Sequence, residues 1–328
     1  MIRRPPRSTQ SRSSAASDVY KRQSKINCFV MSEFNKVLTV VTSSKDKDLH
    51  NKIENIITEF IKNSNITRLK IKNLNPNKAR DYFFLDSKDI INHKNIFRRL
   101  KDYPIDFCLQ NTLNRKKKLL LTDMDGTIIE NETLNDIARF LGKGDQVKKI
   151  TDLGKKGRLD FSTSLNNRVE LLKGLKINSL EEAKKNITFI KGSSVLFSKL
   201  NESGIHTILV SGGFKPMSTY VKKKLHIKEE FSNTFGIDGD RFNGLVEGPV
   251  VNASYKETIL NKYKEKLNLD TNEIVSIGDA ANDLNMLLSS GLPIAYKATD
   301  VVKANIDNQI NHTDLISVLY YLGIKNNK

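Results

Sequence analysis

Two aspartates, one residue apart, end an apolar run in the segment LLLTDMDGTIIENE, residues 119–132. Residues two apart on an extended strand point to the same side, so we expect the side chains of Asp123 and Asp125 to face the same space. Asp123 could then attack a phosphorus atom as a nucleophile, while Asp125 protonates the leaving oxygen and afterwards activates water. Asp-Gly-Thr also suits the N-cap of a helix after a strand, so this segment alone leaves both interpretations open.

Polar residues also follow two further apolar runs. The segment VSGGF offers the hydroxyl of Ser211 and the amide of Gly212 to a phosphate oxygen, and GDAAND supplies Asp279, Asn282 and Asp283. Ligands of open parallel sheets bind outside the carboxyl ends of the strands, so these segments should meet the aspartates of the first motif in one crevice. Each segment alone is compatible with an ordinary turn, but their order and spacing together favour a single site.

Such a group of carboxylates predicts a bound cation, because close carboxylates repel each other and are costly to bury. All candidate ligands are oxygens, which favours Mg²⁺, with Mn²⁺ as an alternative. Gly126 permits a tight turn, and Thr127 could donate a hydrogen bond to a phosphate oxygen. Lys256 could neutralise phosphate and hold Asp123, although in a lysine-rich chain a solvated helix residue is an equally good interpretation.

Short apolar runs that alternate with helical segments predict how these residues are positioned. This pattern is typical of a Rossmann-like α/β fold, in which helices cover both faces of a parallel sheet. The predicted strands are 117–125, 206–213, 272–280 and 292–297, and the helical segments between them include 194–204 and 255–267. Residues 133–190 are predicted to be an all-helical insertion after the first strand, where a cap over the site would lie.

The preceding part of the chain has a different pattern. Its order β-α-β-β-α-β predicts a small ferredoxin-like or ACT-like α+β domain. The predicted strands are 35–42, 66–74, 79–86 and 105–112, and the predicted helices are 47–63 and 88–103. We therefore expect a leader over 1–30, an N-terminal domain over 31–115 and a catalytic domain over 116–328.

Composition limits the other classes of function. The 328 residues include 54 Lys and Arg against 37 Asp and Glu, a formal net charge of +17 that raises the question of a nucleic-acid partner. The basic residues are spread along the chain without an Arg/aromatic patch, so we expect no nucleic-acid partner. The two cysteines have no metal-type or disulfide-framework spacing, and no apolar stretch reaches the ~18 residues of a membrane span, which favours a cytoplasmic protein without a membrane partner.

The leader is basic and rich in Arg and Ser, like a transit peptide, but its paired prolines argue against an amphipathic helix. We expect residues 1–30 to be disordered and interpret them as a non-native translation of adaptor sequence, with a natural start near Met31.

The motifs resemble those of the haloacid-dehalogenase-like phosphohydrolases. DMDGT resembles the first motif, Ser211 falls on the serine of the second, Lys256 on the lysine of the third, and GDAAND on the acidic fourth motif. Within that superfamily, 118–322 is most similar to the phosphoserine phosphatases. One departure is Ala280, where the family usually has glycine; if the position needs a positive φ, alanine costs strain of order 1 kcal/mol.

The resemblance also implies roles in the cap. Glu132 would contact the amine of the substrate, Arg168 would hold its carboxylate with a guanidinium fork, and Phe161 would help to close the cap. It further implies that the metal is held by Asp123, the main-chain carbonyl of Asp125, and Asp279 of the fourth motif.

The function expected from the resemblance is Mg²⁺-dependent hydrolysis of O-phosphoserine through an aspartyl phosphate, with Asp283 and Thr127 supporting the site. The first alternative is another small phosphomonoester, or transfer of the phosphate to an acceptor alcohol. The second is a non-catalytic amino-acid sensor built on the N-terminal domain, which could also mediate homodimerisation. Intact acidic motifs speak against the second alternative.

Overall fold

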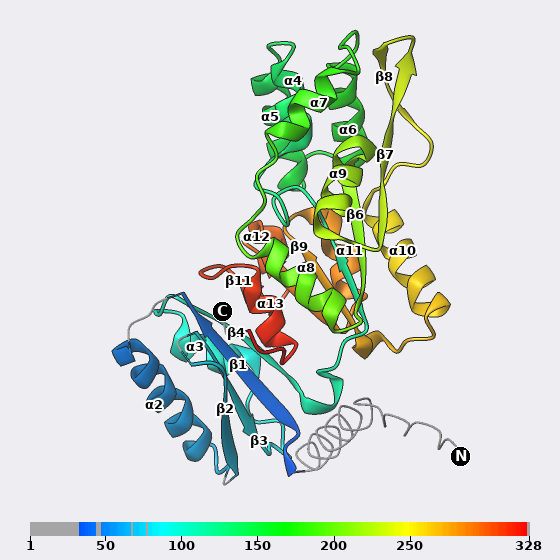
Figure 1. Cartoon of the computed structure of the whole chain (residues 1–328). Coiled ribbons are helices and arrows are strands. Elements are labelled where there is room, and N and C mark those ends of the chain that lie inside the picture. The colour runs from blue at the N-terminus through cyan, green and yellow to red at the C-terminus, as the bar shows by residue number, and fades with distance from the viewer. Residues whose placement is uncertain (1–32, 44–46, 67, 77, 327–328) are drawn as a thin grey trace, which may run out of the picture.

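The structure is a computed structural model that describes residues 33–43, 47–66, 68–76 and 78–326. An α/β core lies between an N-terminal α+β part and a group of helices that covers the other end of the core (Figure 1). The leader 1–30, for which we predicted disorder, lies outside the described residues. No helix in the part of the chain that the structure describes is long and apolar enough to cross a membrane.

The N-terminal part has the element order β-α-β-β-α-β. Its sheet is antiparallel in the order β2-β3-β1-β4. The elements are β1 (Lys36–Thr42), α2 (Lys47–Asn63), β2 (Leu69–Asn75), β3 (Ala79–Phe84), α3 (His93–Leu100) and β4 (Ile105–Asn111). The prediction of a helix over 88–103 was too long: Asn92 caps α3 by accepting a hydrogen bond from the amide of Asn95, so the helix begins at His93.

One face of this sheet packs against its own helices, and the other packs against the end of the chain. Arg115 joins the two parts: its guanidinium forms an ion pair of 2.7 Å with the buried Asp81 and donates to the carbonyl of Tyr320 at 2.9 Å. Asp106 accepts hydrogen bonds from the backbone amides of 311–313. A buried guanidinium with these partners fixes the N-terminal part on the core.

The thiol of Cys108 tests this packing. Cys108 lies on β4 in the hydrophobic cluster shared by both parts of the molecule, and burial raises its pKa to about 12. We expect native protein at pH 8 to react with a thiol reagent about 10³-fold more slowly than a free cysteine, because so little thiolate is present. Labelling followed by mass spectrometry would measure this rate at Cys108; labelling as fast as in urea-unfolded protein would show that the N-terminal part does not stay docked.

The core is a seven-stranded sheet in the order β11-β10-β9-β5-β6-β7-β8. Six strands run parallel, and β8 is antiparallel to β7 at one edge. The strands are β5 (Leu119–Thr122), β6 (His206–Phe214), β7 (Glu229–Asp238), β8 (Arg241–Glu247), β9 (Ile274–Gly278), β10 (Leu292–Tyr296) and β11 (Gln309–Ile310). The predicted α/β class with its parallel sheet is confirmed, and the motif-bearing strands β9, β5 and β6 are neighbours at its centre.

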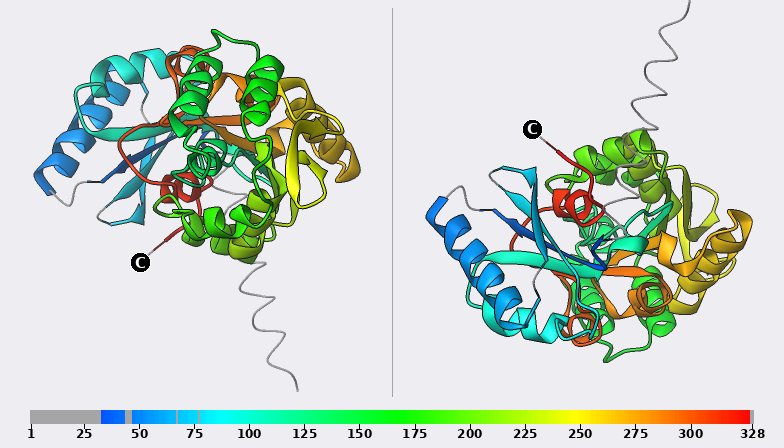
Figure 2. Two further views of the ribbon diagram at one scale, coloured as in Figure 1. Left: turned by 90° about the horizontal axis from the view of Figure 1, so that it is seen from above. Right: turned by 90° about the horizontal axis from the view of Figure 1, so that it is seen from below.

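Helices cover both faces of this sheet (Figure 2). They are α8 (Ser193–Glu202), α9 (Lys215–Leu225), α10 (Ala253–Lys266), α11 (Leu284–Leu288), α12 (Asp300–Lys303) and α13 (Ile316–Tyr321). The strands between them are apolar on both sides: all four residues of β5 are buried. This burial explains why the strands of the core read as continuous apolar runs in the sequence.

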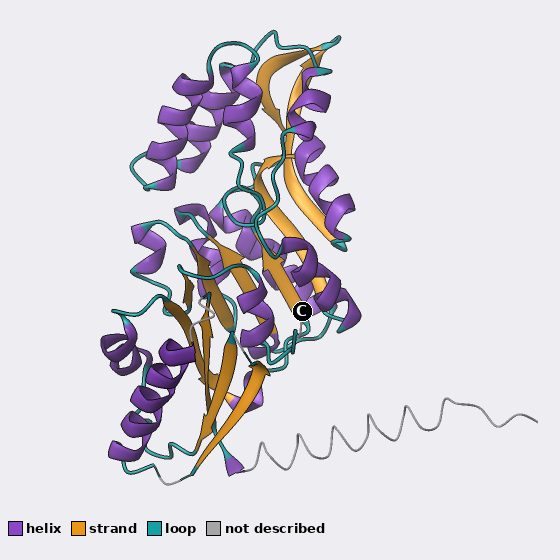
Figure 3. Ribbon diagram, turned by 60° about the vertical axis from the view of Figure 1, so that its left-hand side comes forward, coloured by secondary structure: helices purple, strands orange, loops and turns teal. Residues whose placement is uncertain are grey.

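The cap consists of four helices at the carboxyl ends of the strands (Figure 3). They are α4 (Thr133–Arg139), α5 (Gly144–Lys155), α6 (Phe161–Glu170) and α7 (Ser179–Lys185). The cap is not formed by helices alone: β8 packs along α6, and the amide of Phe242 donates to the carbonyl of Leu175 at 2.9 Å. The β7–β8 hairpin, which the sequence analysis did not predict, therefore braces the cap from the core.

Candidate active site

Asp123 lies directly after β5, in the buried centre of the site. Lys256 of α10 donates to its Oδ1 at 2.5 Å and to Oδ1 of Asp283 at 2.6 Å, and the Lys256 side chain is fully buried. Burial raises the pKa of Asp123 well above its usual range, and Lys256 opposes that rise. Since Lys256 holds Oδ1, the second carboxylate oxygen of Asp123 is left for chemistry.

Asp125 follows at the rim of the cavity. Its Oδ2 accepts hydrogen bonds from the backbone amide and the hydroxyl of Thr133, at 3.1 and 2.9 Å, while its buried Oδ1 has no hydrogen-bond partner among the described residues. Burial, followed by the nearby Glu132 carboxylate, raises the pKa of Asp125 to about 7. A carboxyl group with this pKa can both donate and accept a proton near neutral pH.

Asp279 completes the acidic cluster from the end of β9. Oxygens of Asp123, Asp279 and Asp283 all lie within 4.8 Å of one another. Thr127 donates to Oδ1 of Asp279 at 3.0 Å, so its hydroxyl orients a carboxylate where we had expected it at phosphate. Oδ2 of Asp283 accepts from the backbone amides of Asp279 and Ala280, which fixes the turn after β9.

The charges of the site suit a divalent cation. Five carboxyl groups surround three cationic side chains, which leaves an excess of two negative charges; the carboxyl groups are Asp123, Asp125, Glu132, Asp279 and Asp283, and the cations are Lys155, Arg168 and Lys256. The ligands available at the cluster are hard oxygens, and burial, together with the neighbouring carboxylates, raises the pKa of Asp123 and of Asp279. The residues therefore fit an ion of the Mg²⁺ class.

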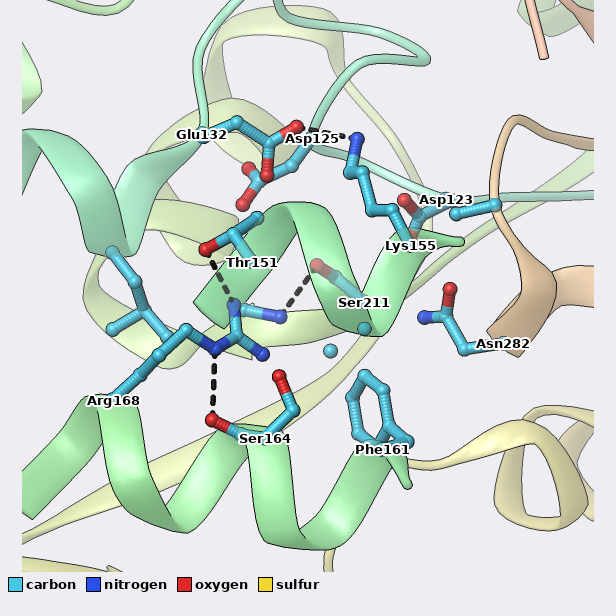
Figure 4. Close-up of a pocket in the computed structure, with 15 residues that line it drawn as sticks. Asp123, Asp125, Glu132, Thr151, Lys155, Phe161, Ser164, Arg168, Ser211 and Asn282 are labelled. Atoms are coloured by element: carbon cyan, nitrogen blue, oxygen red, sulfur yellow. Dashed lines mark hydrogen bonds and ion pairs between the residues drawn. The ribbon is translucent and has the colours of Figure 1, made fainter. Parts of the chain in front are cut away.

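The residues at the carboxyl end of β6 form another wall of the cavity. The amide of Gly213 donates to the Ser211 hydroxyl at 2.9 Å, so the hydroxyl proton is free to be given to a ligand. The ring of Phe161, from the cap, covers Gly212: a Cβ at that position would lie 2.6 Å from Cζ of the ring. Asn282 projects into the same cavity from the turn after β9 (Figure 4).

The cap supplies the remaining wall. Arg168 of α6 is anchored by a hydrogen bond of 3.0 Å from Nε to the Ser164 carbonyl and one of 3.4 Å from Nη1 to the Thr151 hydroxyl (Figure 4). Glu132 forms an ion pair with Lys155. Burial lowers the pKa of Lys155, but the carboxylates of Asp279 and Glu132 outweigh it and raise the pKa above its ordinary value, so the ammonium is charged.

All the predicted site residues lie at or beside one cavity, although they come from both cap and core. Four of them do not line the cavity itself: Lys256 lies behind Asp123, and Thr127, Asp279 and Asp283 belong to the hydrogen-bonded cluster beside it. Thr133, Thr151, Lys155 and Ser164 belong to the site but were not predicted. They lie in helical segments with unremarkable patterns, and nothing in their spacing marks them.

The alanine in the fourth motif causes no strain. Ala280 has φ −127° and ψ 167°, an extended conformation that any residue adopts. The strain that a positive φ would have imposed is therefore absent, and Ala280 simply lines the cavity.

The cavity between the cap and the core is narrow. The cavity has a volume of about 50 Å³, which leaves room for only a few water molecules. A phosphorylated metabolite is larger than this, so we expect the cap to move away from the core when substrate enters.

The parallel sheet, the helical cap after its first strand and the aspartate cluster at the strand ends are the arrangement expected of a haloacid-dehalogenase-like hydrolase. The family model for haloacid dehalogenase-like hydrolases matches residues 117–291. The chain belongs to the haloacid dehalogenase-like hydrolase family.

Individual relatives extend the similarity beyond that segment. A probable phosphoserine phosphatase from Schizosaccharomyces pombe is 37% identical over 243 residues, covering 74% of this chain and 80% of the relative. A solved hydrolase of the same family from Salmonella enterica serovar Typhi is 27% identical, with a TM-score of 0.76 over 88% of this chain and 98% of its own. A solved phosphoserine phosphatase, captured as a phospho-aspartyl intermediate analogue, is 38% identical with a TM-score of 0.61, over 63% of this chain and 99% of its own.

Proposed function

We propose that the chain is a Mg²⁺-dependent phosphoserine phosphatase, which hydrolyses O-phospho-L-serine to L-serine and phosphate in the last step of serine biosynthesis. The observation that carries the proposal is the pair Asp123 and Asp125 at the end of β5, which lines one cavity together with Arg168 and Glu132. Relatives at 37 and 38% identity are phosphoserine phosphatases, one of them probable by its name, and support this substrate.

The reaction has two steps. In the first, Asp123 attacks phosphorus, the bond from phosphorus to the serine oxygen breaks, and Asp125 gives its proton to that oxygen. In the second, Asp125 takes a proton from water, which attacks the aspartyl phosphate and releases phosphate. Lys256 holds the nucleophile in place through Oδ1, and the pKa of about 7 for Asp125 suits both proton transfers.

The metal and the phosphate group have separate ligands. Asp123, the main-chain carbonyl of Asp125, and Asp279 would hold Mg²⁺, or Mn²⁺ in its place; the ion supplies positive charge against the charge that develops on the phosphate oxygens. Ser211, Gly212 and Asn282 are then the donors to the phosphate group; they supply a hydroxyl, a backbone amide and a side-chain amide.

The cap recognises the amino-acid end of the substrate. Arg168 would bind the carboxylate and Glu132 the ammonium group, while Phe161 closes over the phosphate side and excludes water. We further propose an N-terminal domain over 31–115, followed by a catalytic domain to 328. A homodimer through the N-terminal domain and a cytoplasmic location stay predictions.

Phosphate release over a panel of esters tests the substrate. The panel contains phosphoserine, phosphothreonine, phosphoglycolate and a sugar phosphate, each with Mg²⁺ and with excess chelator. We expect release that depends on the metal and is highest with phosphoserine. Higher turnover of phosphoglycolate or the sugar phosphate would contradict the amino-acid site while leaving the chemistry intact.

Arg168→Met tests the proposed contact between Arg168 and the carboxylate of the substrate. Because a buried charged partner is lost, we expect kcat/KM for phosphoserine to fall about 100-fold. An aryl phosphate without a carboxylate should lose less than about threefold by the same argument. Arg158→Met, at an exposed cap arginine, is the matched control and should behave as wild type. An equal loss on both substrates would show that Arg168 supports the cap and does not recognise the substrate.

A further inference from the structure

One cationic residue of the cap reaches into the acidic cluster of the core. Lys155 is the last residue of α5, and its Nζ lies 2.9 Å from Oδ2 of Asp279. The same ammonium group forms the ion pair with Glu132 (Figure 4). A Cβ on Gly126 would lie 3.1 Å from the same nitrogen. The ammonium group therefore sits between the cap, the first-motif turn and the end of β9.

In this position Lys155 occupies a carboxylate oxygen of Asp279, to which the metal ion is proposed to bind. Thr127 occupies Oδ1 of Asp279, and Lys155 occupies Oδ2, so both oxygens of the side chain already have partners. A divalent ion that binds to Asp279 has to take the place of one of them. A hydroxyl can turn and still solvate a metal-bound carboxylate, whereas a second cation at the same oxygen is repelled. The group that has to leave is therefore Lys155.

We propose that Lys155 is a built-in competitor of the metal ion: its ammonium group neutralises Asp279 in the metal-free enzyme and leaves when the ion binds. This inference rests on the metal site of the proposed function. Because Lys155 belongs to the cap and Asp279 to the core, the same contact ties the cap to the core. Binding of the ion breaks the contact between Lys155 and Asp279, and the ion pair with Glu132 keeps the displaced ammonium group near the site.

If Lys155 and the metal ion exclude each other from Asp279, the lysine must weaken metal binding by a measurable factor. The apparent metal dissociation constant is the intrinsic one divided by the fraction of molecules in which Asp279 is free of Lys155. Coupling between two binding events in a protein is typically about 5- to 150-fold, so we expect the lysine to weaken metal binding about tenfold.

Direct binding of Mn²⁺ tests the proposal without any substrate. The free ion is followed by electron paramagnetic resonance as it is added to metal-free protein, for wild type, Lys155→Met and Lys155→Arg. Lys155→Met keeps the length of the side chain and removes its charge, so we expect Mn²⁺ to bind about tenfold more tightly. Lys155→Arg keeps the charge and should bind nearly as wild type.

Lys156→Met is the matched control, because it removes the same charge from the exposed neighbouring residue. It should change the dissociation constant less than about twofold. Equal affinities for Lys155→Met and Lys156→Met, or weaker binding by Lys155→Met, would overturn the proposal. Asp279→Asn distinguishes failure of the Lys155 proposal from failure of the proposed metal site. If wild type binds Mn²⁺ no better than this variant, the metal site itself is wrong.

Proteolysis in the presence of chelator gives a second readout. If Lys155 ties the cap to the core, metal-free Lys155→Met should be cleaved in the segments that flank the cap faster than metal-free Lys156→Met. Equal cleavage rates would contradict the proposed tie.

Discussion

Asp123→Asn is expected to lower phosphate release at least about 10⁴-fold, because an amide cannot form the acyl phosphate and removal of a nucleophile costs this much in comparable enzymes. The fold should survive. Lys256 keeps its contact of 2.6 Å with Asp283, and burial already disfavours the charged form of Asp123. The unfolding temperature should therefore stay close to that of wild type, so lost activity would report on chemistry alone.

Acid quenching of the reaction with labelled phosphoserine tests whether an acyl phosphate forms on the enzyme. Wild type should carry a phosphate that survives acid and is removed by hydroxylamine, as an acyl phosphate is, whereas Asp123→Asn should carry none. Asp125→Asn is the informative companion, because the nucleophile remains and the proton donor is lost. Asp123→Asn that retained a tenth of wild-type turnover would exclude this aspartate as the nucleophile.

The parts of the site that could be predicted from sequence are those that follow buried strands. Asp123, Ser211 and Asp279 each come at the end of an apolar run, and the rule that ligands bind at the carboxyl ends of parallel strands brings them together. The structure bears this out, because β9, β5 and β6 are neighbours.

Contacts made by the cap could not be predicted in the same way. Lys155 is one of several lysines in an amphipathic helix, and only the orientation of α5 over the core brings it to Asp279. Thr133 is similar: at the start of α4 it resembles an ordinary helix residue, yet it holds Asp125 by two hydrogen bonds. Tertiary packing decides both contacts, and no local pattern encodes them.

The β7–β8 hairpin was missed for a different reason. Its sequence contains the hairpin signal Asp238-Gly239, but the flanking residues alternate poorly between polar and apolar. Strand β8 alternates in burial, but its buried positions include Gly244 and one of its exposed positions is Leu245. The residue types therefore hide the half-buried pattern that the strand has in the structure.

The position of the N-terminal part was also beyond sequence reasoning. The basic run Lys116–Lys118 joins the two parts, and in it Lys117 is buried and donates to the carbonyl of Asn272 at 2.5 Å. Neighbouring Arg115 is buried in the contact between the two parts. A run of basic residues is usually solvated, and here the docking of two sheets with complementary carbonyls and Asp81 overrides that tendency.

Lys256→Met is expected to destabilise the protein and to impair turnover together. The fully buried ammonium serves two buried carboxylates, Asp123 and Asp283, and removing the only cation that contacts either of them in the described structure leaves like charges facing each other. Breaking a buried pair in this way costs about 3 to 5 kcal/mol of unfolding free energy. Asp123 also loses the contact that orients it, so we expect kcat to fall at least about 100-fold.

The pH dependence of this loss identifies its cause. Burial raises the pKa of Asp123 and Lys256 opposes the rise, so the variant should have a still higher pKa at this carboxyl group. A carboxyl group with a raised folded-state pKa contributes stability that is fully present below its unfolded-state pKa and is lost as the pH rises through the folded-state pKa. The deficit relative to wild type should therefore be larger at pH 8 than at pH 5, in thermal unfolding followed by circular dichroism. A deficit independent of pH would indicate lost packing instead of unpaired charge.

Two further variants separate the effect of buried charge from that of the contact between Lys256 and Asp123. Lys262→Met removes the same charge from an exposed position of α10 and should leave stability and kcat unchanged. Adding Asp283→Asn to Lys256→Met removes one of the two facing carboxylates, while the amide oxygen can still accept from the backbone amides of Asp279 and Ala280. We expect the double variant to be more stable than Lys256→Met but no more active, because stability depends on balancing the buried charge, whereas turnover depends on the contact that Lys256 makes with Asp123.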